Sequence, residues 1–215
     1  MLAYLRTPQF IWAVIAMVVV ISASNVLVMY PVQAQLGGID LADILTWGAF
    51  SYPVAFLVTD LTNRRFGPKG ARMVVICGFV VAVALSIVLA SPRIAVASGS
   101  AFLVAQFLDI AIFDRLRQGQ WWHPPLFSSL VSSALDTLIF FSLAFALPFA
   151  VLDTGLGRAD GSLAFPAPLL GVGPEVELWV SLACGDFLVK LLLSGLMLAP
   201  YKGLLAFFTE RMARA

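Results

Sequence analysis

The sequence predicts an all-α, polytopic membrane protein with six transmembrane helices. Of its 215 residues, 61% are hydrophobic and only 12% are charged, and the mean hydropathy is +0.97. A soluble domain usually carries about twice that charged fraction. Apolar runs of about 20 residues, the length that crosses a bilayer as a helix, recur along the whole chain. We therefore expect residues 1–215 to form a single transmembrane domain.

Turn signals divide the chain into its expected spans. Each apolar stretch is long enough to cross about 30 Å of hydrocarbon at about 1.5 Å per residue. The second ends at Gly67-Pro68, which cannot continue a helix, and the third closes at Ser91-Pro92. Pro124 suits the first turn of the fifth. The predicted spans are 9–31, 42–62, 71–91, 95–115, 124–150 and 176–199, and residues 152–175 form the one long loop.

The first apolar stretch shares some features with a signal peptide. Residues 22–24 have the small side chains of a cleavage site, and Arg6 is the one charge before the stretch. The run from Phe10 to Met29 is nevertheless longer than the apolar core of a usual signal peptide. We therefore expect a retained first helix.

Cysteine and histidine usage gives no sign of a metal site or a cofactor. Cys77 and Cys184 each fall within an apolar run, where they are most simply small buried residues. The sequence has no CxxC spacing, and its single histidine, His123, cannot form a metal site alone. It also lacks a nucleotide-binding loop of the GxxxxGK[ST] type and a nucleophile–base constellation. We expect neither an enzyme nor an ATP-driven motor.

Lysine and arginine are concentrated in the loops on one side of the predicted bundle. The opposite loops carry only Arg93 and Arg158, together with several acidic residues. Basic loops stay in the cytoplasm, so both termini are expected there. The residues on the basic side are Arg6, Arg64, Arg65, Lys69, Arg72, Arg115, Arg117, Lys202, Arg211 and Arg214.

Polar side chains inside the predicted spans suggest a binding site within the bundle. Such residues are costly in a bilayer and are most often functional. Gln106 and Asp109 share one face of span four, and Ser128, Ser132 and Asp136 follow one another at four-residue spacing in span five. Serines alone are equally well explained by close helix packing. Asp136 has no cation in its own helix, which favours a functional role.

Span six carries an acid and a base that are four residues apart. Asp186 and Lys190 can therefore pair along the helix, either as a structural ion pair or as part of a site. Depths estimated from the helical rise place the polar residues of several spans in one middle-to-outer layer. These residues are Asn25, Gln106, Asp136, Asp186 and Lys190.

Two further acids have a structural interpretation: Asp60 is expected near the cytoplasmic edge, and Asp109 between that level and the middle-to-outer layer. Asp60 is expected to pair with Arg64 and Arg65 as an end-of-helix charge, with a gating role as the alternative. Asp109 is expected to pair with Arg115 or another basic residue if it does not serve the site. We class Asp60, Arg64, Arg65 and Arg115 as gating or structural residues.

Six segments of the chain carry a family resemblance. They are SASN (22–25), WGAFSYPVAFLVTDLTNRRFG (47–67), KGAR (69–72), QFLDIAIFDRLRQGQWW (106–122), SSLVSSALDTLIFFSLAF (128–145) and DFLVK…P (186–200). In these segments the chain resembles the queuosine precursor transporters, within the vitamin-uptake-transporter-like group of bacterial membrane proteins. Many members carry a glutamate where this chain has Arg64, and others an amide where it has Ser133.

The resemblance implies a function and a location. It implies uptake of 7-cyano-7-deazaguanine and 7-aminomethyl-7-deazaguanine across the bacterial inner membrane, for salvage of the tRNA nucleoside queuosine. It also implies a fold similar to the six-helix substrate-binding subunits of energy-coupling-factor transporters, working without the coupling ATPase. The alternatives are a substrate-binding subunit for another purine-like or vitamin heterocycle that needs an ATPase partner, and a scaffolding protein whose polar groups only hold helices together.

The polar residues have the chemistry that such a ligand needs. A 7-deazaguanine offers adjacent N–H donors that one carboxylate accepts together. We assign Asp136 to this edge, with Asp186 as the second choice, and expect the ring to stack on Phe140 or Phe56. Lys190, Gln106 or Asn25 could donate to the carbonyl oxygen of the ligand. The predicted substrate-binding set is Asn25, Phe56, Gln106, Asp109, Asp136, Phe140, Asp186 and Lys190.

The expected partners are this small molecule and the lipid bilayer, with no nucleic acid. Small residues suit helix association in membranes, so the sequence leaves a homodimer open.

Overall fold

The computed structural model describes residues 3–27, 30–37, 39–41, 45–89 and 91–213, and most of them are helical. The long helices are α1 (Pro8–Leu27), α2 (Gly48–Leu89), α3 (Pro92–Leu116), α4 (His123–Phe145), α6 (Leu178–Leu196) and α7 (Leu198–Ala213). The shorter elements are η1 (Ala3–Arg6), β1 (Gln35–Leu36), β2 (Ile39–Asp40), η3 (Leu147–Phe149), α5 (Val151–Thr154), β3 (Pro166–Pro168), η4 (Leu169–Gly171) and β4 (Glu175–Glu177).

Length and composition identify the membrane-crossing helices. Within the described residues, four helices are long and apolar enough to cross a membrane: 48–85, 92–116, 123–145 and 178–207. Helix α1 contributes a shorter apolar stretch, 8–24. The structure thus supports the predicted polytopic helical protein, although the predicted second and third spans lie in the single helix α2.

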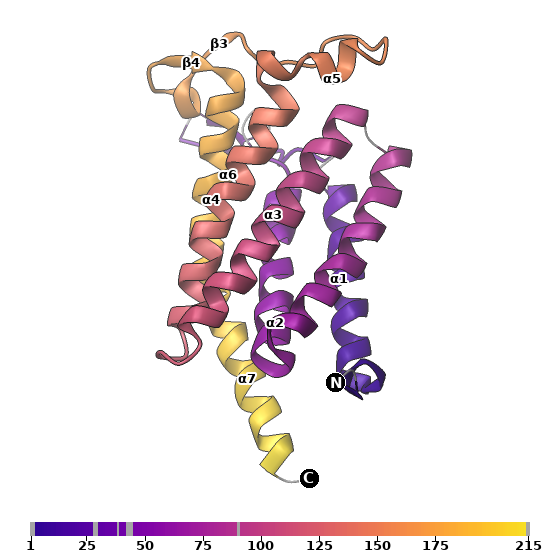
Figure 1. The fold of residues 1–215 in the computed structure, drawn as a ribbon. Coiled ribbons are helices and arrows are strands. Elements are labelled where there is room, and N and C mark those ends of the chain that lie inside the picture. Colours follow the sequence, from indigo (N-terminus) through magenta and orange to yellow (C-terminus); the bar gives the residue numbers. More distant parts are fainter. Residues whose placement is uncertain (1–2, 28–29, 38, 42–44, 90, 214–215) are drawn as a thin grey trace.

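Helix α2 turns back on itself at Gly67. This residue has φ 74° and ψ 179°, a conformation that only glycine adopts readily. Pro68 follows it and suits the first turn of a new helix. Figure 1 shows the first arm of α2 (48–66) running toward the end of the bundle where both chain termini lie, and the second arm (68–89) running back.

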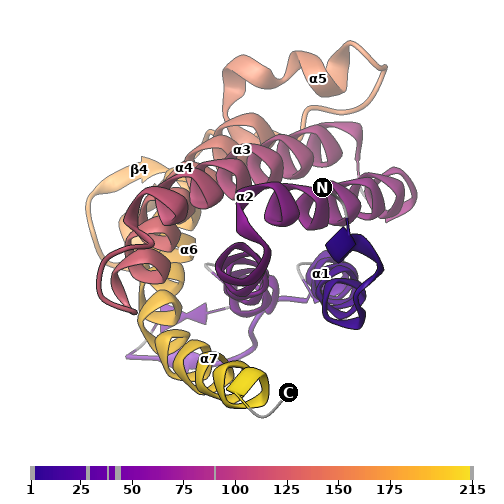
Figure 2. The same ribbon diagram turned by 60° about the horizontal axis from the view of Figure 1, so that its bottom comes forward.

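Seen from that end, the first arm of α2 lies in the middle of the bundle (Figure 2). Helices α1 and α6 lie on either side of it, and the second arm of α2, α3 and α4 pack along its remaining side. Helix α1 approaches the second arm so closely that a Cβ atom on Gly78 would lie 2.6 Å from Cγ of Met17. Small residues permit such close approach in membrane proteins. Around this contact lies an apolar core that includes Met17, Val74, Val75 and Phe102.

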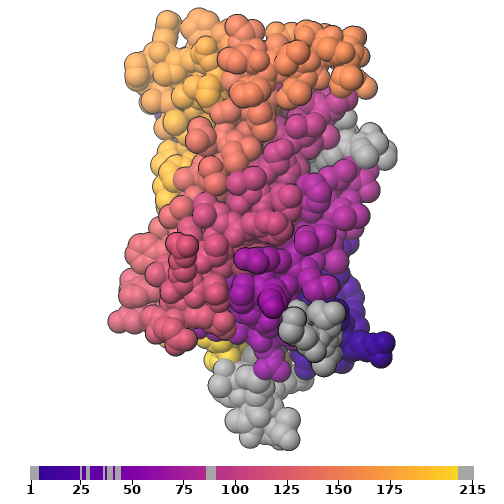
Figure 3. Space-filling model, viewed as in Figure 1, coloured from indigo at the N-terminus to yellow at the C-terminus, as the bar shows by residue number. Residues whose placement is uncertain are grey.

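The connection between α4 and α6 forms a layer over the opposite end of the bundle (Figures 1 and 3). The predicted fifth span, 124–150, was too long: α4 ends at Phe145, and Pro148 lies in the 3₁₀ helix that follows. The predicted loop 152–175 contains α5, η4 and most of an antiparallel pair of strands, in which Pro166 faces Glu177 and Pro168 faces Glu175.

Arg93 fixes this layer to the bundle. Its side chain is 1% exposed and lies at the start of α3. The guanidinium donates to the carbonyls of Leu143 and Ala146 at the end of α4, at 2.9 and 2.7 Å. It also donates to Asp153 at 3.2 Å and to Ser162 at 3.0 Å, both in the connection. A planar, five-donor group is well suited to gathering several acceptors in this way.

Candidate functional site

A cavity of about 250 Å³ lies within the bundle, between α1, α2, α3, α4 and α6. It lies in the half nearer the connecting layer, because its lining includes Thr46 just before α2, Phe145 at the end of α4 and Leu182 early in α6. Its other lining residues are Ile21, Ser24, Leu45, Gly48, Ala49, Tyr52, Ala82, Ser98, Phe102, Asp136, Phe140, Phe141, Asp186 and Lys190.

The charged part of the cavity is a triad of Lys190, Asp136 and Asp186. The Lys190 ammonium lies 2.7 Å from Asp136 on the facing helix α4 and 2.5 Å from Asp186 on its own helix. It also donates to the Thr137 hydroxyl at 3.2 Å, and Thr137 in turn donates to Asp186 at 2.7 Å. With all three groups ionised, the triad carries one net negative charge.

The triad leaves acceptors available to a ligand. An ammonium has three donors, and here they meet Asp136, Asp186 and Thr137, so Lys190 has none to spare. Oδ1 of Asp136, by contrast, is buried and has no hydrogen-bond partner within the described part of the chain. The side chain of Asp186 is 15% exposed, against 4% for that of Asp136. The arrangement therefore suits a ligand that donates hydrogen bonds or carries positive charge.

Aromatic rings form the walls around these charges. Tyr52, from the first arm of α2, lies with its ring centroid 5.4 Å from the Lys190 ammonium, a cation–π contact. Its ring meets that of Phe102 edge-on at 6.5 Å. Phe140 and Phe141 pack edge-on at 5.1 Å on the α4 side. A flat heterocycle placed among these rings would have faces to stack against.

A second buried polar cluster lies closer to the termini. The Thr59 hydroxyl donates to Oε1 of Gln106 at 2.6 Å, while Nε2 of Gln106 has no described partner. Asp60 accepts a hydrogen bond from Ser128 at 3.4 Å and lies close enough to Asp109 for their carboxyl groups to interact. This cluster joins the first arm of α2, α3 and α4, as the cavity does, but it lies outside the cavity.

The structure brings together only part of the predicted substrate-binding set. Asp136, Phe140, Asp186 and Lys190 line the cavity, and the expected Asp186–Lys190 contact along α6 is present. The other members lie elsewhere or are not described: Gln106 and Asp109 belong to the second cluster, Phe56 lines a small pocket with Asp60 and Tyr201, and the side chain of Asn25 lies outside the described residues.

Gln106 does not line the cavity, although it is buried. The residues that α3 contributes to the cavity are Ser98 and Phe102, and Gln106 lies one turn further toward the termini. Helix α3 crosses the bundle at a tilt (Figure 1), with its first half beside the cavity.

Two expected ion pairs are absent from the described residues. Asp60 forms no salt bridge with Arg64 or Arg65, and Asp109 forms none with Arg115. The Arg64 guanidinium instead donates to the Tyr201 hydroxyl at 3.2 Å and to the Arg117 carbonyl at 2.8 Å.

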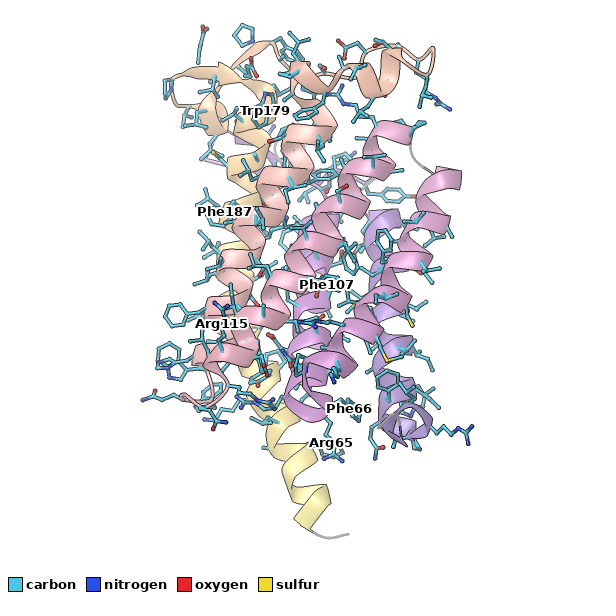
Figure 4. All side chains as sticks on the ribbon, viewed as in Figure 1. Arg65, Phe66, Phe107, Arg115, Trp179 and Phe187 are labelled. Carbon is cyan, nitrogen blue, oxygen red and sulfur yellow. The ribbon has the colours of Figure 1, made fainter. Side chains whose placement is uncertain are left out.

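Arg115 is exposed, in the half of the bundle where Arg65 also lies (Figure 4). The physical reason for the missing pairs is depth. The acids are buried between helices, whereas the arginines follow them in the sequence and sit at the helix ends.

Several cavity residues lacked an assigned role in the sequence interpretation. The sequence interpretation gave Tyr52 no role, yet it lines the cavity. It lies one turn before Phe56, on the same face of the first arm. Thr137 was likewise assigned no role, although it bridges Lys190 and Asp186. Among the described residues, no group of three or more His, Cys, Asp or Glu side chains is placed to hold a metal ion.

Comparison with known proteins identifies the relatives of this chain. A family model described as "Putative vitamin uptake transporter" matches residues 46–91 and 85–203. A protein named queuosine precursor transporter from Escherichia coli K12 is 32% identical, over 93% of this chain and 87% of that protein. A probable queuosine precursor transporter from Haemophilus influenzae is 30% identical, over 90% and 84%, and one from Bacillus subtilis is 25% identical, over 73% and 69%. No solved structure matches the chain.

Proposed function

Since the chain belongs to the vitamin uptake transporter family, we propose that it imports queuosine precursors across a bacterial inner membrane. Its ligands would be 7-cyano- and 7-aminomethyl-7-deazaguanine, held in the cavity that contains the Lys190 triad. The chain would act as a carrier, with no catalytic step and no cofactor.

One observation carries the assignment of the site: the unpartnered Oδ1 of Asp136. A buried carboxylate oxygen without a donor is costly, and a ligand that supplies an N–H removes that cost. The adjacent N–H groups of a 7-deazaguanine match this need, and Asp186 offers a more exposed carboxylate for a cationic substituent. Tyr52, Phe102 and Phe140 supply the apolar walls that a flat ring requires.

The charge distribution supports a topology of six crossings with both termini in the cytoplasm. The crossings would be α1, the two arms of α2, α3, α4 and α6, because the turn at Gly67 returns α2 to the side where it began. In Figure 4, Arg65 and Arg115 lie toward the end that carries both termini, and Trp179 lies at the opposite end. Arginine accumulates on the cytoplasmic side of membrane proteins.

The likeness to energy-coupling-factor substrate-binding subunits and a homodimeric state both remain predictions. The same holds for activity without an ATPase partner. If uptake required ATP and a coupling protein that co-purifies with this chain, the alternative function, a substrate-binding subunit, would be supported instead of an independent carrier.

The test is queuosine in tRNA, measured in cells that make no precursor, with and without this protein, at nanomolar 7-aminomethyl-7-deazaguanine. Queuosine that forms only when the protein is present supports import. Absence of queuosine, while the protein is folded in the membrane and cytoplasmic processing enzymes are intact, would contradict it.

A further inference from the structure

The pair Asp60 and Asp109 has no part in the cavity, and its burial is extreme. Asp60 on the first arm of α2 is 2% exposed, and Asp109 on α3 is 0% exposed. Their carboxyl groups interact with each other, and Ser128 on α4 donates to Asp60. Neither oxygen of Asp109 receives a hydrogen bond from any described residue.

Within the described part of the chain, no cation forms a salt bridge with the pair. Among the described charged and titratable groups, Arg64 and Tyr201 face the pair. Arg64 attracts Asp60 but donates its hydrogen bonds to the Tyr201 hydroxyl and the Arg117 carbonyl. No described salt bridge includes Asp60 or Asp109. Two ionised carboxylates side by side inside a membrane repel each other and lack the solvation that would stabilise them.

We propose that Asp60 and Asp109 share one bound proton, and that this pair is the proton-binding site through which substrate uptake is coupled to proton entry. The proton forms an O–H bond with one carboxyl group, which then donates to the other. This removes one negative charge and supplies the donor that Asp109 lacks. The coupling role rests on the proposed transport function, whereas the bound proton does not.

The polar face of α4 connects this pair with the cavity. Ser128, Ser132 and Asp136 lie at four-residue spacing, so each step covers about 6 Å of helix. The hydroxyls of Ser132 and of its neighbour Ser133 are buried and have no described partner. Each hydroxyl both donates and accepts, which is what proton transfer along a chain of groups requires.

A small pocket adjoins the pair. A small pocket of about 10 Å³ is lined by Asp60, Ser129 and Tyr201, among others, and lies between the pair and α7. A space of this size admits about one water molecule. A proton that leaves the carboxyl group, by cleavage of its O–H bond, would pass to water here. The pair thus has the serines of α4 leading toward the cavity and a water-sized pocket beside it.

The bound proton can be tested without substrate. Infrared difference spectra of the reconstituted full chain at neutral pH should contain the carbonyl stretch of a protonated carboxylic acid, which shifts in D₂O. We expect loss of this band in Asp109→Asn and its retention in Asp114→Asn, a half-exposed carboxylate in a surface pair with Arg117. Absence of the band from the unaltered protein, or its full retention in both Asp60→Asn and Asp109→Asn, would overturn the proposal.

Coupling is tested in vesicles with a pH dye inside and labelled 7-aminomethyl-7-deazaguanine outside. An inward proton gradient should raise the initial uptake rate at least fivefold, and Asp109→Asn should abolish this stimulation while still binding the ligand. Equal stimulation in Asp109→Asn, or stimulation by a sodium gradient alone, would overturn the coupling. Failure of the unaltered protein to bind the ligand would instead contradict the proposed function, and the infrared band would still report the proton.

Discussion

The ammonium of Lys190 on α6 lies 2.7 Å from the carboxylate of Asp136 on α4, and both side chains are 4% exposed. This contact joins two helices that are not adjacent in the sequence, and both residues line the cavity. Removal of the cation would leave two neighbouring carboxylates without compensation. Breaking a buried ion pair from one side typically costs about 3–5 kcal/mol.

Lys190→Met is therefore expected to lower the thermal midpoint of the detergent-solubilised protein by roughly 10 °C. The double variant Lys190→Met, Asp136→Leu should recover much of this stability, because it removes one of the buried charges, but it should not bind ligand. Lys202→Met is the matched control: Lys202 is exposed and contacts the ring of Trp121. A midpoint unchanged by Lys190→Met would show that the triad does not hold the helices together.

Asp186 is expected to set the preference between the two precursors. The 7-aminomethyl compound is cationic at neutral pH and the 7-cyano compound is neutral, while the triad carries one net negative charge. Asp186→Asn makes the triad neutral and should weaken binding of the cationic ligand at least tenfold, or about 1.4 kcal/mol, relative to the neutral one. Calorimetric titration of both ligands measures this ratio. Equal loss for both ligands would assign Asp186 to another part of the substrate.

Arg93 is expected to protect the connection between α4 and α6 from cleavage by a protease. Lysine in its place is a single point charge and cannot reach the two α4 carbonyls, Asp153 and Ser162 together. Loss of one or two such charged hydrogen bonds, about 2 kcal/mol, should speed tryptic cleavage after the exposed Arg158 by roughly thirtyfold in Arg93→Lys. Arg158→Gln identifies the cleaved bond. Unchanged cleavage in Arg93→Lys would show that the layer is held by other contacts.

The same loop should be insensitive to pH near neutrality. The hydroxyl and backbone amide of Ser162, and then Arg93, lower the pKa of Asp160. A carboxylate with a lowered pKa stabilises the fold above its ordinary value of about 3.9 and loses that effect only as the pH falls through the lowered value. Tryptic cleavage of the unaltered protein between pH 6 and 8, corrected for the activity of trypsin, is therefore expected to be constant.

Gly67 is expected to stabilise the turn in α2. A Cβ atom there would meet no neighbour within 4 Å, so any effect of Gly67→Ala comes from its φ of 74° rather than from a clash. Such strain costs about 1–3 kcal/mol for a non-glycine residue. We expect a lower thermal midpoint and less protein in the membrane. Gly195→Ala is the control, because its site is equally open and has helical geometry; equal effects of the two substitutions would refute the argument.

The apolar helices and the contacts within one helix can be predicted from the sequence, whereas the packing of one helix against another cannot. Hydropathy locates the spans, and four-residue spacing correctly predicts that Asp186 and Lys190 meet, because both signals are local. The contact between Asp136 and Lys190 joins helices α4 and α6, and no periodicity in either helix specifies it. The sequence interpretation left Asp136 without a cation because it considered only partners within the same helix.

The positions of Gln106 and Asp109 also depend on how the helices pack against one another. Both are buried polar residues, as predicted, but they lie outside the cavity, beside Thr59 and Asp60. The place of Tyr52 in the cavity depends on the central position of the first arm of α2 (Figure 2), which is a property of the assembled bundle.

The most direct test of the central claim is uptake of labelled 7-aminomethyl-7-deazaguanine by vesicles that contain Asp136→Asn. The amide keeps the shape of the side chain but exposes one donor where the ligand needs an acceptor. We expect uptake to fall at least thirtyfold, about 2 kcal/mol, while the protein stays folded in the membrane and Asp114→Asn transports normally. Uptake by folded Asp136→Asn equal to that of the unaltered protein would contradict the account, because the substrate would then bind elsewhere.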